Sequence, residues 1–141
     1  MGGSDLKLRT KEYALGIIRL FSELPKRTEV QILGRELFRS ATSVGAQYRE
    51  ATWGKSNADF ISKIEGSLQE LEESEYWLEL LAESGFYPEY RLRALKDETS
   101  ELKGIFVTMS EAPKPVSLSA RSFILALTCR IPGRFWSSRP Y

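Results

Sequence analysis

The chain has 141 residues and a formal net charge of +1, with 42% hydrophobic and 28% charged residues. These values fit one globular domain with a buried core and exclude a wholly disordered chain. The sequence contains no histidine, which removes the commonest metal ligand, the commonest general base and every Ser/His or Cys/His nucleophile pair. We therefore expect a protein that is not an enzyme, with no catalytic residue, no metal site and no cofactor.

Charge is distributed unevenly along the chain. Residues 1–112 carry 15 basic and 19 acidic residues, whereas residues 113–141 carry five basic residues and no acid. Pro113 and Pro115 mark the change in composition. We predict an N-terminal lead over residues 1–9, a helical domain over residues 10–111 and a weakly ordered basic tail over residues 112–141.

The sequence shows no sign of a membrane segment or a secretory signal. It has no run of 18 apolar residues, and residues 1–5 lack the basic and apolar regions of a signal peptide. Cys129 is the single cysteine, so the chain cannot form an internal disulfide. These features predict a cytoplasmic protein that does not contact a membrane.

The first predicted helix spans residues 10–24 and ends before Pro25, whose ring cannot continue a helix. Apolar residues recur along it at spacings of three and four, so they share the face expected to line a core. They are Ala14, Ile17, Ile18, Phe21 and Leu24.

The second predicted helix opens at Thr28, where Gln31 would complete a capping box, and continues to the break at residues 54–55. Its middle, residues 40–46, consists of small residues of modest helix propensity. This composition indicates either a kink or a close approach of another helix.

The third predicted helix begins after Ser56, which reads as an N-cap with Asp59, and ends at Gly85, a favourable residue just past a helix. Pro88 suits the first turn of the fourth helix. The connections between the four helices are short, so successive helices should be antiparallel. The expected fold is all-α, an up-down-up-down four-helix bundle.

Four stretches of the sequence resemble a known family, in the order in which the family has them. They are LRTKEYAL (8–15), SATSVGAQYREA (40–51), SNADFISK (56–63) and YWLELL (76–81). Together, over about residues 6–109, they resemble the bacterial four-helix-bundle proteins encoded in intervening sequences of 23S ribosomal RNA genes. A related branch is the accessory variability protein of diversity-generating retroelements.

The resemblance implies a homopentameric, barrel-like assembly of four-helix protomers with basic surfaces. In the retroelement branch, such an assembly binds nucleic acid and a partner reverse transcriptase. Gln47 stands where the family is expected to carry an asparagine.

A row of arginines is the first candidate site. On a helical wheel Arg35, Arg39 and Arg49 lie within about 40° of Trp53, opposite the apolar residues of the same helix. Such a cationic stripe with an aromatic at its end is typical of a surface that binds phosphates and splayed bases. The spacing alone favours a solvated face, or pairing with carboxylates of a neighbour, and it is the family resemblance that adds weight to nucleic-acid contact. Further candidates for nucleic-acid contact are Lys55, Arg91 and Arg93.

The second candidate is acidic. Between Ile64 and Tyr90 there are eight acids and no base, but without histidine these acids do not form the usual di-metal pattern of a helix bundle. The heptad register points Glu75 at the core, where a carboxylate needs a partner such as Arg49 or Gln47, or a place at the bundle's edge. We predict structural polar contacts, and the residues assigned to them are Glu75, Gln47 and Glu50.

The third candidate is apolar surface. Trp77, Leu80 and Leu81 flank or oppose the expected core stripe, so a single bundle would leave Trp77 and Leu80 largely in water. Their burial between subunits predicts a homo-oligomer, consistent with the pentamer that the resemblance implies. Coverage by the fourth helix or the tail is the alternative.

The combined hypothesis is a non-catalytic oligomeric accessory protein that binds an RNA or DNA backbone, a partner such as a reverse transcriptase, or both. One rival is a purely structural protein–protein scaffold. The other is an enzyme that uses carboxylates with a divalent cation.

Overall fold

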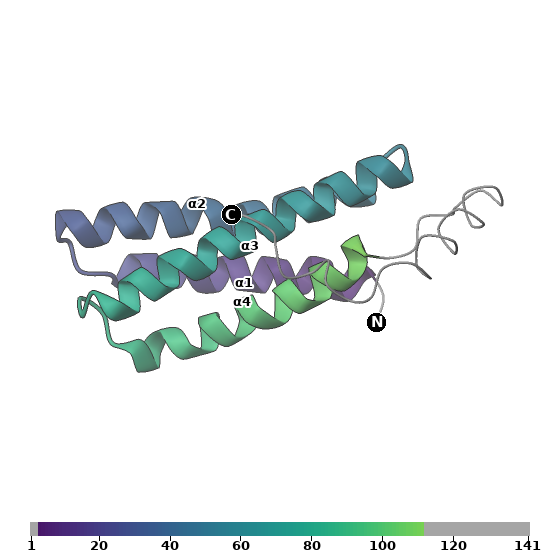
Figure 1. Cartoon of the computed structure of the whole chain (residues 1–141). Coiled ribbons are helices and arrows are strands. Elements are labelled where there is room, and N and C mark those ends of the chain that lie inside the picture. The colour runs from purple at the N-terminus through teal and green to yellow at the C-terminus, as the bar shows by residue number, and fades with distance from the viewer. Residues whose placement is uncertain (1–2, 112–141) are drawn as a thin grey trace, which may run out of the picture.

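A computed structural model describes residues 3–111, with side chains from Asp5 onward, as four α-helices (Figure 1). They are α1 (Gly3–Glu23), α2 (Thr28–Thr52), α3 (Asn57–Glu83) and α4 (Glu89–Ser110). Successive helices run in opposite directions, which confirms the predicted all-α four-helix bundle. The predicted tail, residues 112–141, lies outside the described residues.

The first helix begins earlier than expected. α1 starts at Gly3, so the predicted lead over residues 1–9 is helical from that residue onward. Tertiary contacts hold this extra length: Arg9 Nε donates to Glu98 Oε1 of α4 at 2.6 Å, and Leu6 packs against the core. Packing of this kind, more than intrinsic propensity, stabilises most helices in proteins.

The start of α2 also differs from expectation. The N-cap is Arg27 and no side chain caps the helix, so the predicted capping box of Thr28 and Gln31 does not form. Gln31 instead donates from Nε2 to the carbonyl oxygen of Pro25 at 3.0 Å. This bond ties the first turn of α2 to the connection that precedes it.

The small residues in the middle of α2 permit a close approach of its neighbours. α2 is one continuous helix from Thr28 to Thr52. Ser40 Oγ lies 2.8 Å from Ser74 Oγ of α3 in the core, and Ser67 Oγ donates to the carbonyl oxygen of Val44 at 3.2 Å. Of the two predicted alternatives, close packing is therefore the one observed.

Local signals placed the ends of α3 correctly. Ser56 Oγ accepts a hydrogen bond from the backbone N–H of Asp59 at 3.1 Å, as an N-cap should. At the other end Gly85 has a φ of +73°, the left-handed conformation that glycine adopts readily. Pro88 is the N-cap of α4, one residue before the predicted first turn.

The core runs through the length of the bundle. Its largest fully buried members include Ile17, Leu37, Ile64, Leu71, Leu78, Leu92, Leu102 and Phe106. Ile18, which was predicted to share the core face of α1, is 41% exposed. The apolar stripe of α1 is thus narrower than the sequence indicated.

The bundle has two unequal ends (Figure 1). The α1–α2 and α3–α4 connections lie at one end. At the other end, the tip of the α2–α3 hairpin extends beyond the start of α1 and the end of α4. Residues 52–59 at this tip are all exposed. None of the four described helices has the length and apolar character that a bilayer crossing requires.

Candidate functional site

The predicted arginine stripe lies on the outward face of α2. Arg35, Arg39 and Arg49 are exposed, whereas Leu37 and Val44 on the opposite side of the helix are at most 1% exposed. The helical wheel therefore predicted the orientation of these side chains correctly. Their chemical environments, however, differ sharply.

Arg39 is held by carboxylates from two helices. It pairs with Glu73 of α3, with Glu70 of α3 at 3.4 Å and with Glu36 of its own helix at 3.6 Å. The hydrogen bond from Arg39 lowers the pKa of the Glu73 carboxyl below its ordinary value. Glu73 Oε1 also accepts a hydrogen bond from Trp77 Nε1 at 3.1 Å. The charge of Arg39 is neutralised within the chain.

Arg35 and Arg49 have no such partners. Across the described part of the chain neither arginine lies within ion-pair distance of a carboxylate, although both are exposed. Arg35 also borders a hollow of about 270 Å³ that it shares with Phe21, Phe38 and Arg39. Two free guanidinium groups on one helix face are available to bind anions.

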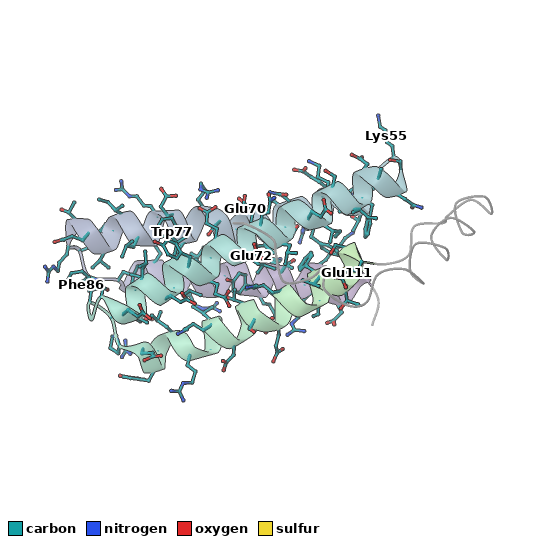
Figure 2. All side chains as sticks on the ribbon, in the orientation of Figure 1. Lys55, Glu70, Glu72, Trp77, Phe86 and Glu111 are labelled. Carbon is teal, nitrogen blue, oxygen red and sulfur yellow. The ribbon has the colours of Figure 1, made fainter. Side chains whose placement is uncertain are left out.

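Trp53 and Lys55 lie at the projecting end of this face. Trp53 is 83% exposed, and the Lys55 side chain extends outward from the tip of the hairpin (Figure 2). The backbone N–H of Lys55 donates to Asp59 Oδ2 at 3.3 Å. The four exposed residues along α2 and at its tip are here called the α2 basic face: Arg35, Arg49, Trp53 and Lys55.

The structure does not bring Arg91 and Arg93 to this surface. Both lie in the first two turns of α4, at the end of the bundle away from the α2–α3 tip (Figure 1). Arg91 pairs with Glu23 at 3.9 Å, and Arg93 borders an open hollow with Glu89, Lys96 and Asp97. Four of the six predicted nucleic-acid contacts thus lie along α2 and at its tip, and the other two lie on α4.

The acids of α3 fall into two groups. The inner group is paired: Glu70 and Glu73 with Arg39, and Glu75 with Lys103 of α4 at 2.5 Å. The outer group is exposed and forms no ion pair among residues 5–111. Its members, here called the α3 acidic face, are Glu65, Glu72, Glu79 and Glu83.

The predicted polar contacts are only partly realised. Glu75 is one-third exposed and its partner is Lys103, so the predicted pairing with Arg49 or Gln47 is wrong. Gln47 is partly buried and donates from Nε2 to Glu70 Oε1 at 3.4 Å. Glu50 is 56% exposed and pairs with a lysine across the hairpin, so it makes no buried contact.

The predicted oligomer contacts also need correction. Leu81 is fully buried in the core of its own chain, which excludes it from a subunit interface. Trp77 is partly buried against the same core, and Leu80 is partly buried as well, so neither side chain is left largely in water. Trp77 packs against the core of its own chain and donates its indole N–H to Glu73 of the same helix, so it is covered within one chain, although not by the fourth helix or the tail that the alternative named.

Exposed apolar residues lie elsewhere on the surface. Leu8, Leu15 and Ile18 of α1 are 54%, 40% and 41% exposed. Leu8 and Leu15 are seven residues apart and so share a face. This spacing was visible in the sequence, but the stronger core stripe on the other side of the helix obscured it.

No group of three or more Cys, His, Asp or Glu residues in the described region is arranged to hold a metal ion. Glu70 and Glu73, which lie one turn apart on α3, both point their carboxylates at Arg39.

Comparison with known families identifies the family to which this chain belongs. The family described as 23S rRNA-intervening sequence protein matches residues 5–108. The chain belongs to this family. The match begins at Asp5, near the start of α1, and ends at residue 108, near the end of α4. The family's domain therefore includes all four helices of the bundle.

A solved structure supports the same assignment. A crystal structure of a protein with unknown function from the S23 ribosomal protein family of Bacteroides thetaiotaomicron is 30% identical to this chain. The similarity covers 75% of this chain and 98% of that chain, with a TM-score of 0.71. A search of curated proteins gave no match.

Proposed function

We propose that this member of the 23S rRNA-intervening sequence family is a non-catalytic, cytoplasmic accessory protein that binds the backbone of RNA or DNA through its α2 basic face. The observation that carries the proposal is the contrast along one helix. Arg39 pairs with three carboxylates, whereas Arg35 and Arg49 on either side of it are exposed and form no ion pair within residues 5–111. Unpaired guanidinium groups bind phosphate well because their donors form bidentate hydrogen bonds.

The spacing of the surface suits an extended ligand. Arg35 and Trp53 are separated by 18 residues of helix, or about 27 Å at the usual helical rise. Contacts of this kind position a strand by its phosphates and do not read its bases. The binding is therefore electrostatic, insensitive to sequence and weakened by salt.

Assembly into a homo-oligomer strengthens the proposal. The family resemblance suggests a homopentameric ring, and the exposed apolar residues of α1 (Leu8, Leu15 and Ile18) offer surface that a second copy can bury. Several copies of a weak site on one particle raise the overall affinity for a long strand. A reverse transcriptase bound to the same ring would be the partner that the related retroelement proteins suggest.

The test is a charge-reversal pair with a matched control. Arg35→Glu/Arg49→Glu should weaken binding of a labelled RNA, followed by fluorescence anisotropy at low salt, by at least about tenfold. Lys11→Glu/Arg19→Glu makes the same charge change on exposed residues of α1. This control should bind within about twofold of wild type. Equal losses in both variants would show a non-specific effect of net charge and would remove the α2 basic face from the proposal.

A purely structural scaffold is the second candidate, and the α3 acidic face favours it. Glu65, Glu72 and Glu79 repeat every seven residues on the outward side of α3 and have no ion-pair partner within residues 5–111. In a ring of identical subunits, this face would meet the α2 basic face of the next copy. Dissociation of the assembly by Arg35→Glu/Arg49→Glu, with wild type failing to bind nucleic acid, would favour the scaffold.

A further inference from the structure

Trp53 is the most exposed large hydrophobic residue in the described part of the chain. Its exposed fraction of 83% exceeds that of Tyr90, at 72%, and of Ile32, at 56%. Trp53 lies at the tip of the α2–α3 hairpin, which extends beyond the rest of the bundle (Figure 1). An indole so far from the core does not stabilise this fold by packing.

We propose that Trp53 stacks on an unpaired base, so that this protein prefers single-stranded RNA or DNA to a duplex. This inference rests on the proposed function and adds to it the structural class of the ligand. Aromatic side chains stack on every base, because each base has a π-face, and this contact is largely indifferent to sequence. Bases inside a duplex are already stacked on each other, so an indole at the tip of a helical hairpin cannot reach their faces.

The backbone around Trp53 is well held, so the indole is presented from a defined position. The N–H of Trp53 donates to the carbonyl oxygen of Glu50 at 3.1 Å, and the N–H of Gly54 donates to that of Ala51 at 3.0 Å. Lys55 donates its backbone N–H to Asp59 Oδ2, and the next residue, Ser56, caps α3. A platform fixed in this way loses little conformational entropy when a base stacks on it.

The charges around the tip favour binding of a nucleic-acid strand through its phosphates. Arg49 lies one helical turn before Trp53 and Lys55 lies two residues after it. The acids nearby are engaged: Glu50 pairs with Lys63 at 2.5 Å, and Asp59 accepts the Lys55 N–H. Arg49 and Lys55, which form no ion pair among residues 5–111, therefore flank the indole in the sequence, as contacts to the phosphates on each side of a stacked base require.

The matched experiment compares two ligands with the same number of nucleotides: a 20-nucleotide oligo(dT) strand and a 10-base-pair duplex, both labelled. Trp53→Ala should weaken binding of the single strand by about tenfold, which corresponds to the loss of one stacked base. It should leave duplex binding within about twofold. Trp53→Phe should retain most of the affinity, and oligo(dT) should quench more tryptophan emission in wild type than in Trp53→Ala.

Tyr76→Ala is the control for loss of an exposed aromatic side chain. Tyr76 is 53% exposed among the acids of α3, where a phosphate is repelled, so its removal should change neither binding constant. A larger effect of Tyr76→Ala than of Trp53→Ala on the single strand would overturn the inference.

The outcomes separate the inference from the proposed function. Wild type that binds neither oligo(dT) nor duplex contradicts both. Wild type that binds both ligands equally, with Trp53→Ala unchanged on each, contradicts the stacking role alone. Trp53→Ala protein that has a smaller native mass than wild type would place Trp53 in a subunit contact, and this result too would overturn the inference.

Discussion

Arg39 of α2 and Glu73 of α3 form an ion pair in which the same carboxylate oxygen also accepts the Trp77 indole N–H, at 3.1 Å. The three side chains join the middle of α2 to α3 on the outer side of the hairpin. One arginine of the predicted stripe is therefore part of the fold, while Arg35 and Arg49 are exposed and form no ion pair among residues 5–111.

The first prediction separates these two roles. Arg39→Ala should lower the free energy of unfolding by about 1 kcal/mol, because it removes a partly exposed ion-pair network. Arg35→Ala, one turn earlier on the same face, should leave stability unchanged. Urea unfolding at one fixed protein concentration measures both, and a larger loss for Arg35→Ala would contradict the assignment.

Alkaline pH should destabilise the bundle through Tyr13. Burial raises the pKa of Tyr13 to about 12, and its hydroxyl lies 2.7 Å from Thr99 Oγ1 of α4. The unfolded chain releases this proton near the ordinary tyrosine pKa of about 10, whereas the folded chain holds it to about pH 12. The free energy of unfolding should therefore fall as the pH rises from about 10 to 12.

Tyr13→Phe should remove this part of the pH dependence. At pH 7 the variant should be about 1 kcal/mol less stable, because it loses the hydrogen bond to Thr99. Between pH 10 and 12 its stability should fall less than that of wild type, as followed by urea titration at each pH. Parallel curves for the two proteins would show that Tyr13 is not held protonated by the fold.

Two glycines should respond in opposite ways to substitution by alanine. A Cβ at Gly34 of α2 would lie 2.7 Å from Leu24 Cδ1 and 3.0 Å from Phe21 Cδ2, whereas a Cβ at Gly104 of α4 meets nothing within 4 Å. Gly34→Ala should destabilise by at least about 1 kcal/mol through overpacking. Gly104→Ala should stabilise by about 0.5–1 kcal/mol through helix propensity. Thermal unfolding of both variants measures the difference, and a gain in stability for Gly34→Ala would contradict the described packing of α1 on α2.

Salt dependence reports how many cations contact phosphate. If Arg35, Arg49 and Lys55 each neutralise one phosphate, the slope of log K against log salt should be roughly −2 per engaged subunit for a single strand. Arg49→Gln should make this slope shallower by about 0.7 per engaged subunit. A titration of RNA binding from low to high salt gives the slope, and an unchanged slope in Arg49→Gln would exclude that contact.

Features set by local chemistry were predictable from the sequence. Ser56 and Gly85 mark the ends of α3 because a cap and a left-handed residue act within one turn of chain. The outward orientation of Arg35 and Arg49 follows from helical periodicity alone. The all-α fold was predictable for the same reason, since periodic apolar residues and short connections determine it.

Features set by contact between helices were not predictable. A helical wheel cannot show that α3 places Glu70 and Glu73 opposite Arg39. The wheel describes one helix at a time and does not give the register between two packed helices. The α1 start was missed for a similar reason, since Arg9 is held by Glu98 of α4, 89 residues away.

The error at Leu81 has a specific cause. The buried stripe of α3 consists of Ile64, Ser67, Leu71, Ser74, Leu78 and Leu81. Two of its members are serines that allow α2 to approach closely, so they interrupt the apolar pattern. Leu68 is only partly buried. An apolar stripe centred on Leu68 places Leu81 on the surface, whereas the observed stripe is rotated away from Leu68.

Native mass spectrometry of the full chain mixed with a 20-nucleotide RNA at low salt tests the central claim most directly. The expected species is a homo-oligomer, five copies of the 16.1 kDa chain, that carries RNA. Arg35→Glu/Arg49→Glu should retain the oligomer and lose the RNA. A wild-type monomer without RNA, or a double variant that carries as much RNA as wild type, would contradict the account.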